Sequence, residues 1–257
     1  MMLIKPTLTA MCVVGLLLTG SVASSVQRAR SATTTAQQPN TLTEQEKKDG
    51  WKLLFDGKTT AGWRNYKKQD ISPKWKVEDG ALMKDEKGAG DIITQDQFEW
   101  FELSIEYRIL KEGNSGIMFR VSEDENAAYL TGPEVQVEDN LNAHDPQLSG
   151  WLYQLYKPAI DPKTDKPVDA TKPFGEWNHL RIILAPDKCE TYMNGVKYYE
   201  YHIGDADWDA QVAKSKFKNM AKFGKIKKGH IDLQDRGDPV AFRNIKIREI
   251  QPKAAQK

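Results

Sequence analysis

The segment at residues 132–140 constrains the fold of this chain more than any other. It reads GPEVQVEDN, so Val135 and Val137 alternate with Glu134 and Gln136. A period of two places the valines on one face of a β-strand and the polar side chains on the other. The sequence therefore predicts a sheet with one side on a hydrophobic core and the other side open to solvent or ligand.

Short extended segments of this kind recur along the chain, separated by Gly, Asn, Asp and Pro. Residues 101–109 alternate between apolar and polar, and Asp79-Gly80 and Asn194-Gly195 are typical of hairpin turns. Residues 205–223 instead show a helical spacing of apolar residues. The pattern predicts an all-β fold, a two-sheet jelly-roll sandwich with one concave open face and one short helical excursion.

The N-terminal residues have the pattern of an export signal. Lys5 precedes an apolar run from Leu8 to Thr19, and small residues up to Ala23 follow. We expect export to the periplasm or the exterior without membrane attachment after cleavage; an uncleaved anchor is the alternative. The expected boundaries are a signal peptide at 1–23, a flexible leader at 24–43, a folded domain at 44–250 and a tail at 251–257.

Charge argues against some classes of partner, and cysteine content indicates how the domain is stabilised. Lys and Arg total 37 against 36 for Asp and Glu, which argues against nucleic acid and anionic membrane surfaces. Without the signal segment only Cys189 remains, so no internal disulfide forms and burial must stabilise the domain. We expect no nucleotide cofactor, and the sequence indicates no particular oligomeric state.

Several motifs resemble, in their order and spacing, those of the 3-keto-disaccharide hydrolase domain family. They are Gly50–Gly57 with Gly62-Trp63, Asn114–Ile117 with Arg120, Gly132–Asp139, Glu176–Asn178, Asn194-Gly195, Gly229–Asp235 and Phe242–Ile245. The resemblance covers about residues 48–250. It implies a concanavalin-like jelly roll, cleavage of glycosides whose glucose ring carries a ketone at carbon 3, and related lyase activity. One position departs: Arg236 stands where the family often has a histidine, so the role of that histidine is in doubt here.

The implied chemistry defines which groups a site needs. The ketone acidifies the proton on carbon 2, and its removal gives an enolate that expels the group on carbon 1. Addition of water to the unsaturated product makes the net outcome hydrolysis. Such a site needs a base, a stabiliser of the enolate oxygen and a proton donor for the leaving oxygen. A divalent metal ion is a suitable electrophile for the ketone and enolate oxygens.

Three residues are candidates for catalysis: Glu134, Asp139 and His144. Glu134 lies on the polar strand face and is expected to act as base or as a metal or substrate ligand. Asp139 ends that strand, and His144 is the histidine nearest to it in sequence. We expect His144 to shuttle protons or, with Glu134, to hold a metal ion. The alternatives are a solvated carboxylate and a surface-loop histidine without a chemical role.

Six further residues are expected to bind the carbohydrate substrate: Asn114, Arg120, Gln136, Tyr153, His230 and Gln234. Strand alternation places Arg120 on the same face as Asn114, where its guanidinium would contact sugar hydroxyls or an enolate. His230 and Gln234 share a face of a later strand. A structural ion pair for Arg120, a turn-capping role for His230 and core burial for Tyr153 are the alternatives.

Two other functions remain compatible with the sequence. A conventional glycosidase would use two carboxylates, but Glu134 and Glu138 lie about 13 Å apart along a flat strand. A retaining pair requires about 5–5.5 Å between carboxyl groups. A non-catalytic carbohydrate-binding module is the second alternative, because the same fold supports binding without catalysis.

Overall fold

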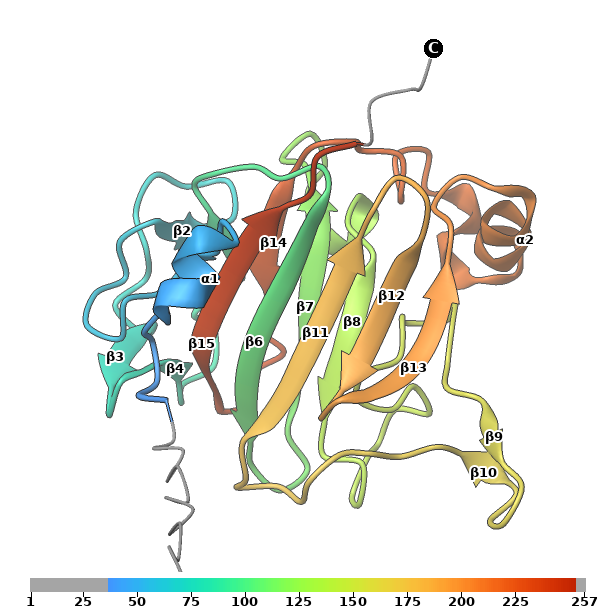
Figure 1. Ribbon diagram of the computed structural model, residues 1–257, viewed down its shortest axis with the longest axis horizontal. Coiled ribbons are helices and arrows are strands. Elements are labelled where there is room, and N and C mark those ends of the chain that lie inside the picture. The colour runs from blue at the N-terminus through green and yellow to red at the C-terminus, as the bar shows by residue number, and fades with distance from the viewer. Residues whose placement is uncertain (1–36, 253–257) are drawn as a thin grey trace, which may run out of the picture. The chain divides into compact units, whose positions relative to one another are not determined.

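The computed structural model describes residues 37–252, which form an eight-stranded sheet, a five-stranded sheet and a separate two-stranded ribbon. The two larger sheets face each other with their strands roughly aligned (Figure 1), and the hydrophobic core lies between them. All sheet pairings are antiparallel. The predicted all-β, two-sheet jelly-roll sandwich is confirmed.

The eight-stranded sheet has the order β13-β12-β11-β6-β15-β4-β3, with β1 paired to β15. Two of its hairpins turn at Asp79-Gly80 and Asn194-Gly195, where all four residues have positive φ, as the sequence predicted. The strands are β1 (Lys52–Leu53), β3 (Lys76–Glu78), β4 (Ala81–Lys84), β6 (Phe101–Ile109), β11 (Asn178–Leu184), β12 (Cys189–Met193), β13 (Val196–Tyr201) and β15 (Val240–Glu249).

The five-stranded sheet has the order β2-β5-β14-β7-β8. In β8, Val135 and Val137 pack into the core while Glu134 and Gln136 face away from it, as predicted. All five residues of β8 are nevertheless buried, because loops cover the outer face of the sheet. The strands are β2 (Trp63–Asn65), β5 (Ile92–Thr94), β7 (Asn114–Val121), β8 (Glu134–Glu138) and β14 (His230–Leu233).

A β-bulge interrupts strand β7 at Arg120. Met118 pairs with Asp232 and Val121 pairs with His230, so three steps along β7 match two steps along β14. The extra residue is Arg120, whose φ of 53° places it in the left-handed region. Because of this bulge, Met118 and Val121 belong to the same small apolar cluster.

The bulge turns the Arg120 side chain away from the outer face. Its guanidinium lies over the ring of Trp100, 4.2 Å from the ring centre. The prediction that Arg120 shares a face with Asn114 is therefore wrong, because strict alternation ends at the inserted residue.

Helical structure is confined to short segments. Helix α2 (Ala206–Lys214) buries Trp208 and is followed by the 3₁₀ turn η2 (Lys216–Asn219), in agreement with the predicted excursion. The remaining elements are α1 (Glu44–Lys48), the 3₁₀ turn η1 (Ala128–Leu130), and the ribbon of β9 (Ile160–Asp161) and β10 (Lys166–Pro167). None of the helices within residues 37–252 is long and apolar enough to cross a membrane.

The packed structure begins earlier than the expected domain start at residue 44. The Asn40 side chain donates to the Gly80 carbonyl at 2.8 Å and accepts from the Asn244 backbone at 2.8 Å. Residues 37–43 therefore belong to the domain rather than to a leader. The expected signal peptide, residues 24–36 of the expected leader and residues 253–257 lie outside the described residues.

Candidate active site

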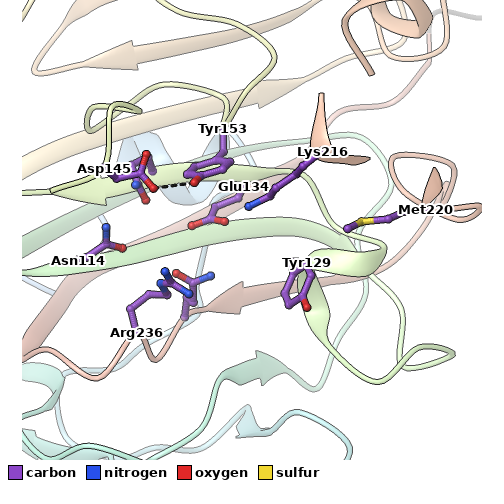
Figure 2. A pocket seen from close by; sticks show the side chains of 10 residues that line it. Asn114, Tyr129, Glu134, Asp145, Tyr153, Lys216, Met220 and Arg236 are labelled. Carbon is purple, nitrogen blue, oxygen red and sulfur yellow. Dashed lines mark hydrogen bonds between the residues drawn. The ribbon is translucent and has the colours of Figure 1, made fainter. Parts of the chain in front are cut away.

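A cavity of about 380 Å³ lies on the outer face of the five-stranded sheet, the face opposite the core. Strands β7 and β8 form its floor, and η1, the segment around η2 and the loop after β8 surround it (Figure 2). Its lining residues are Asn114, Tyr129, Glu134, Gln136, Asp145, Tyr153, Lys216, Met220, Gln234 and Arg236. We call this space the Glu134 cavity.

Glu134 is the buried carboxylate of the cavity, with 7% of its surface exposed. Among the described residues none donates a hydrogen bond to its carboxylate. Burial raises the pKa of Glu134 to about 7, although the positive charges of Lys216 and Arg236 oppose the rise. A carboxylate with this pKa accepts and releases a proton near neutral pH, as a general base requires.

Gly116 provides the space that the Glu134 side chain occupies. A Cβ atom at position 116 would lie 2.2 Å from Glu134 Oε1, closer than any real contact. Gly116 pairs with Gln136 in the β7–β8 ladder, so the Glu134 side chain leans along the sheet toward Gln136. The glycine of the Asn-Ser-Gly motif is thus needed to seat the carboxylate.

Two buried amide oxygens of the cavity lack partners. Within residues 37–252, neither Gln136 Oε1 nor Gln234 Oε1 accepts a hydrogen bond. An unsatisfied buried acceptor costs about 1–3 kcal/mol, and native proteins rarely leave one without a function. Both oxygens are suited to accept hydrogen bonds from the hydroxyl groups of a sugar.

The wall of the cavity combines a tyrosine with an acid and a lysine. The Tyr153 hydroxyl donates a hydrogen bond of 2.6 Å to Asp145, drawn as a dashed line in Figure 2. Lys216 Nζ lies 4.1 Å from the centre of the Tyr153 ring. Burial lowers the pKa of Lys216 and raises the pKa of Tyr153, so the phenol keeps its proton at neutral pH.

A second carboxylate, Asp232, is fully buried on the same sheet face. Neither of its oxygens has a partner within the described part of the chain. Burial raises the pKa of Asp232 well above its usual range, and the nearby carboxylates of Asp91 and Glu134 add to this rise. Burial without a partner among the described residues thus favours the protonated form of Asp232. Burial also raises the pKa of Asp91 to about 6.

The structure brings five of the nine predicted site residues into the Glu134 cavity. These five are Asn114, Glu134, Gln136, Tyr153 and Gln234. Arg120, Asp139, His144 and His230 do not line it.

Asp139 stabilises the loop that follows β8. Its carboxylate accepts hydrogen bonds from the backbone of Glu112 and Leu141 and from the side chain of Asn142. With 2% of its surface exposed, it is buried among these donors. The geometry thus assigns Asp139 a structural position.

His144 lies next to the cavity, with 78% of its side chain exposed. It lines an adjoining depression of about 360 Å³ that shares Asn114, Asp145 and Arg236 with the Glu134 cavity. Its Nε2 is 4.0 Å from a carboxylate oxygen of Glu112. A metal ion held by Glu134 and His144 stays a prediction, with the two residues lining different depressions. Within residues 37–252, no group of three or more His, Cys, Asp or Glu is placed to bind a metal ion.

His230 occupies the expected face of β14 but lies away from the cavity. Its Nδ1 is 2.6 Å from the Thr94 carbonyl oxygen, and its Nε2 is 3.0 Å from the Gln97 side chain. The imidazole thus connects two neighbouring segments, a structural role other than the expected turn-capping alternative.

Five lining residues were not predicted from the sequence: Tyr129, Asp145, Lys216, Met220 and Arg236. Of these, Arg236 could have been proposed from the sequence, because it stands where the family that this chain resembles often has a histidine. The other four come from loops and 3₁₀ turns, where no periodicity indicates which way a side chain points.

A family model described as "3-keto-alpha-glucoside-1,2-lyase-like domain" matches residues 50–248. The chain belongs to this family. A curated relative named 3-keto-disaccharide hydrolase, from Bacteroides thetaiotaomicron, is 35% identical over 237 residues, with 79% of each chain covered. The match confirms the family resemblance found in the sequence.

Two solved structures from Parabacteroides distasonis, each described as a "putative glycosyl hydrolase", share the fold. The first is 30% identical with a TM-score of 0.76, covering 83% of this chain and all of the other. The second is 27% identical with a TM-score of 0.57, covering 78% and 99%. Together with the family match, these likenesses support a glycoside-cleaving enzyme.

Proposed function

We propose that this member of the 3-keto-alpha-glucoside-1,2-lyase-like family cleaves 3-keto-glucosides in the Glu134 cavity by proton abstraction and elimination, with net hydrolysis. The supporting observation is Glu134 itself: a buried carboxylate, without a donor among the described residues, whose pKa is raised to about 7. Activation of carbon 2 by the ketone calls for a base of this kind. The relative named 3-keto-disaccharide hydrolase supports the substrate class.

The reaction balances in two steps. In the first, Glu134 takes the proton from carbon 2, the bond from carbon 1 to the glycosidic oxygen breaks, and the leaving oxygen gains a proton. The sugar becomes a 1,2-unsaturated 3-ketone. In the second, water adds its oxygen to carbon 1 while a proton returns to carbon 2. The products are 3-keto-glucose and the free alcohol.

The other lining groups meet the remaining requirements. Lys216 and Arg236 supply positive charge for the oxygen that becomes an enolate. Tyr153 carries a proton donor for the leaving oxygen, and its hydroxyl is oriented by Asp145, which lines both depressions. Gln136 and Gln234 offer acceptors for sugar hydroxyls. A leaving group would extend into the adjoining depression beside His144.

The pH profile follows from the two shifted groups. Glu134 must be ionised to act as base, so kcat/KM should rise with pH through about 7. Lys216 must be charged, and burial lowers its pKa. As the pH rises further, activity should therefore fall again, and it should do so at a lower pH than the ordinary pKa of lysine. The resulting profile is bell-shaped.

The deciding experiment uses isotope exchange. The protein is incubated in D₂O with phenyl α- and β-glucosides and with their 3-keto derivatives, and the released sugar is analysed by NMR. Elimination followed by water addition places deuterium on carbon 2 of the product from the keto substrate alone. A 3-keto-glucose control without enzyme corrects for spontaneous exchange.

Each other outcome identifies another function. Release from the keto substrate without deuterium at carbon 2 contradicts elimination and indicates direct displacement. Release from the plain glucoside indicates a conventional two-carboxylate glycosidase. Binding of either sugar without release indicates a carbohydrate-binding module. Metal dependence stays a prediction, tested by repeating the assay with a chelator and with added divalent ions; no step above is assigned to a metal.

A further inference from the structure

A second cavity, of about 390 Å³, lies beside helix α2. It shares no lining residue with the Glu134 cavity. Its walls are mainly aromatic and aliphatic, from Trp100, Ile203, Val212 and Phe223. Arg120, the bulge residue of β7, also lines it, and we call this space the Arg120 cavity.

Arg120 is a buried cation without an anionic partner. Only 4% of its surface is exposed, and no carboxylate of the described residues lies within ion-pair distance. Its Nε and Nη2 both donate to one acceptor, the backbone oxygen of Glu99, at 3.1 and 2.8 Å. The guanidinium has five N–H donors, so most of its hydrogen-bonding capacity has no partner within residues 37–252.

Burial of such a group is costly unless an anion compensates for it. Buried charges in proteins are normally paired, and the penalty for an unpaired ion amounts to several kcal/mol. Contact with the Trp100 ring offsets only part of that cost. The desolvation is strong enough to lower the pKa of Arg120. An anionic ligand in the cavity would supply the missing partner.

The charges around the opening are more positive than negative. Arg120, Lys225 and Lys227 line the cavity together with two acids, Glu99 and Asp209. The adjacent segment at residues 214–228 contains seven lysines and no acidic residue. This charge distribution favours the entry of a small anion.

We propose that the Arg120 cavity binds a small aromatic carboxylate, with its carboxylate on the guanidinium and its ring against the apolar wall. A guanidinium matches a carboxylate through two parallel hydrogen bonds. The aromatic wall favours a flat apolar ring over a polyhydroxylated sugar. The site is independent of the sugar-cleaving reaction and of Glu134.

Calorimetric titration tests this proposal with benzoate as the probe and benzamide as its neutral isostere. We expect benzoate to bind with one-to-one stoichiometry and benzamide to bind at least about tenfold more weakly, because only the charged group pairs with the guanidinium. Equal affinity for the two compounds, or no saturable benzoate binding at millimolar concentration, would overturn the proposal.

Variants locate the binding. Arg120→Gln should weaken benzoate binding at least about tenfold, and the double variant Lys225→Ala/Lys227→Ala should weaken it severalfold and reduce its salt dependence. The double variant decides the matter if Arg120→Gln fails to fold, because both lysines are exposed. Glu134→Gln and Lys216→Ala should bind benzoate as the unchanged protein does. Loss of binding in these two variants instead would place benzoate in the Glu134 cavity and refute the site.

Discussion

The outer faces of the two sheets carry similar side chains in different surroundings. On β6, in the eight-stranded sheet, Glu102 accepts hydrogen bonds from Arg181 and Arg248. Glu106 lies four residues later on the same face. It accepts hydrogen bonds from Arg243 at 2.7 Å and from Asn244 at 2.9 Å. Each of these carboxylates is thus paired with a cation that a neighbouring strand provides.

On the five-stranded sheet the corresponding groups lack partners. Within residues 37–252, Asp232 and the amide oxygens of Gln136 and Gln234 accept no hydrogen bond. Glu134 is buried with a raised pKa, although two cations lie close enough to lower it. Because folding alone would favour pairing these groups, their unpaired state supports the proposal that a ligand binds to this face.

The largest expected effect is on catalytic activity, which a Glu→Gln substitution should lower on the five-stranded sheet but not on the eight-stranded sheet. Glu134→Gln keeps the shape of the side chain but removes the base, so turnover of a 3-keto-glucoside should fall by about 10²–10⁴-fold. Glu102→Gln is the matched control on the other face and should retain the activity. Product release measured by NMR or a coupled assay checks both. Unchanged turnover in a folded Glu134→Gln protein would remove Glu134 from the site.

The second effect concerns the free energy of unfolding. A Glu→Gln substitution should raise it on the five-stranded sheet and lower it on the eight-stranded sheet. The pKa of Glu134 is raised from 4.5 to about 7, so its contribution to folding falls as pH rises through this range. Glu134→Gln should therefore stabilise the protein at pH 8–9 by on the order of 3 kcal/mol, with little difference at pH 4. Glu102→Gln should destabilise it by about 1–3 kcal/mol, because two arginines lose an ionised partner.

Denaturant unfolding at several pH values measures both changes. A Glu134→Gln variant less stable than the unchanged protein at pH 8–9 would show that the carboxylate is stabilised by contacts rather than strained by burial. A neutral effect of Glu102→Gln would show that pairing on the eight-stranded sheet contributes nothing measurable.

A smaller effect is expected at the unpaired amides. Gln136→Leu removes a buried acceptor that has no partner within residues 37–252 and that we expect to bind the sugar, so KM should rise about tenfold while stability is unchanged or higher. Ser104→Ala, on the outer face of β6, removes a hydroxyl that bonds His179 Nε2 at 2.8 Å and should leave KM unchanged. Steady-state kinetics with thermal unfolding distinguishes them. A loss of stability in Gln136→Leu with unchanged KM would mean that Gln136 is structural.

The two outer faces also show how much of the fold and of the candidate site the sequence alone could predict. The alternation in β6 and β8 correctly indicates which side chains leave the core on both strands. It does not distinguish Glu102 from Glu134, because the difference depends on arginines that other strands bring alongside. The bulge at Arg120 was not predictable from the sequence. One extra residue reverses which side chains of the strand face the core, and the residue types around it do not mark its position.

Residues from irregular segments were the least predictable part of the site. Asp145, Lys216 and Arg236 reach the Glu134 cavity from three segments that are distant in sequence and lack a repeating pattern. His144 was favoured by sequence proximity, but the direction of its loop leaves the imidazole exposed. Strand patterns therefore located the floor of the cavity, whereas its walls required tertiary structure.

The smallest effect is expected in the core between the two faces, at Cys189. Burial raises the pKa of this thiol to about 11, and its Sγ lies 3.9 Å from the Ala185 carbonyl oxygen. A buried, protonated thiol is neither nucleophilic nor accessible. Cys189→Ser should therefore leave kcat/KM unchanged, and Cys189 of the native protein should not react with iodoacetamide. Inactivation by either change, in a protein shown to be folded, would mean that chemistry depends on the core and not on the unpaired face alone.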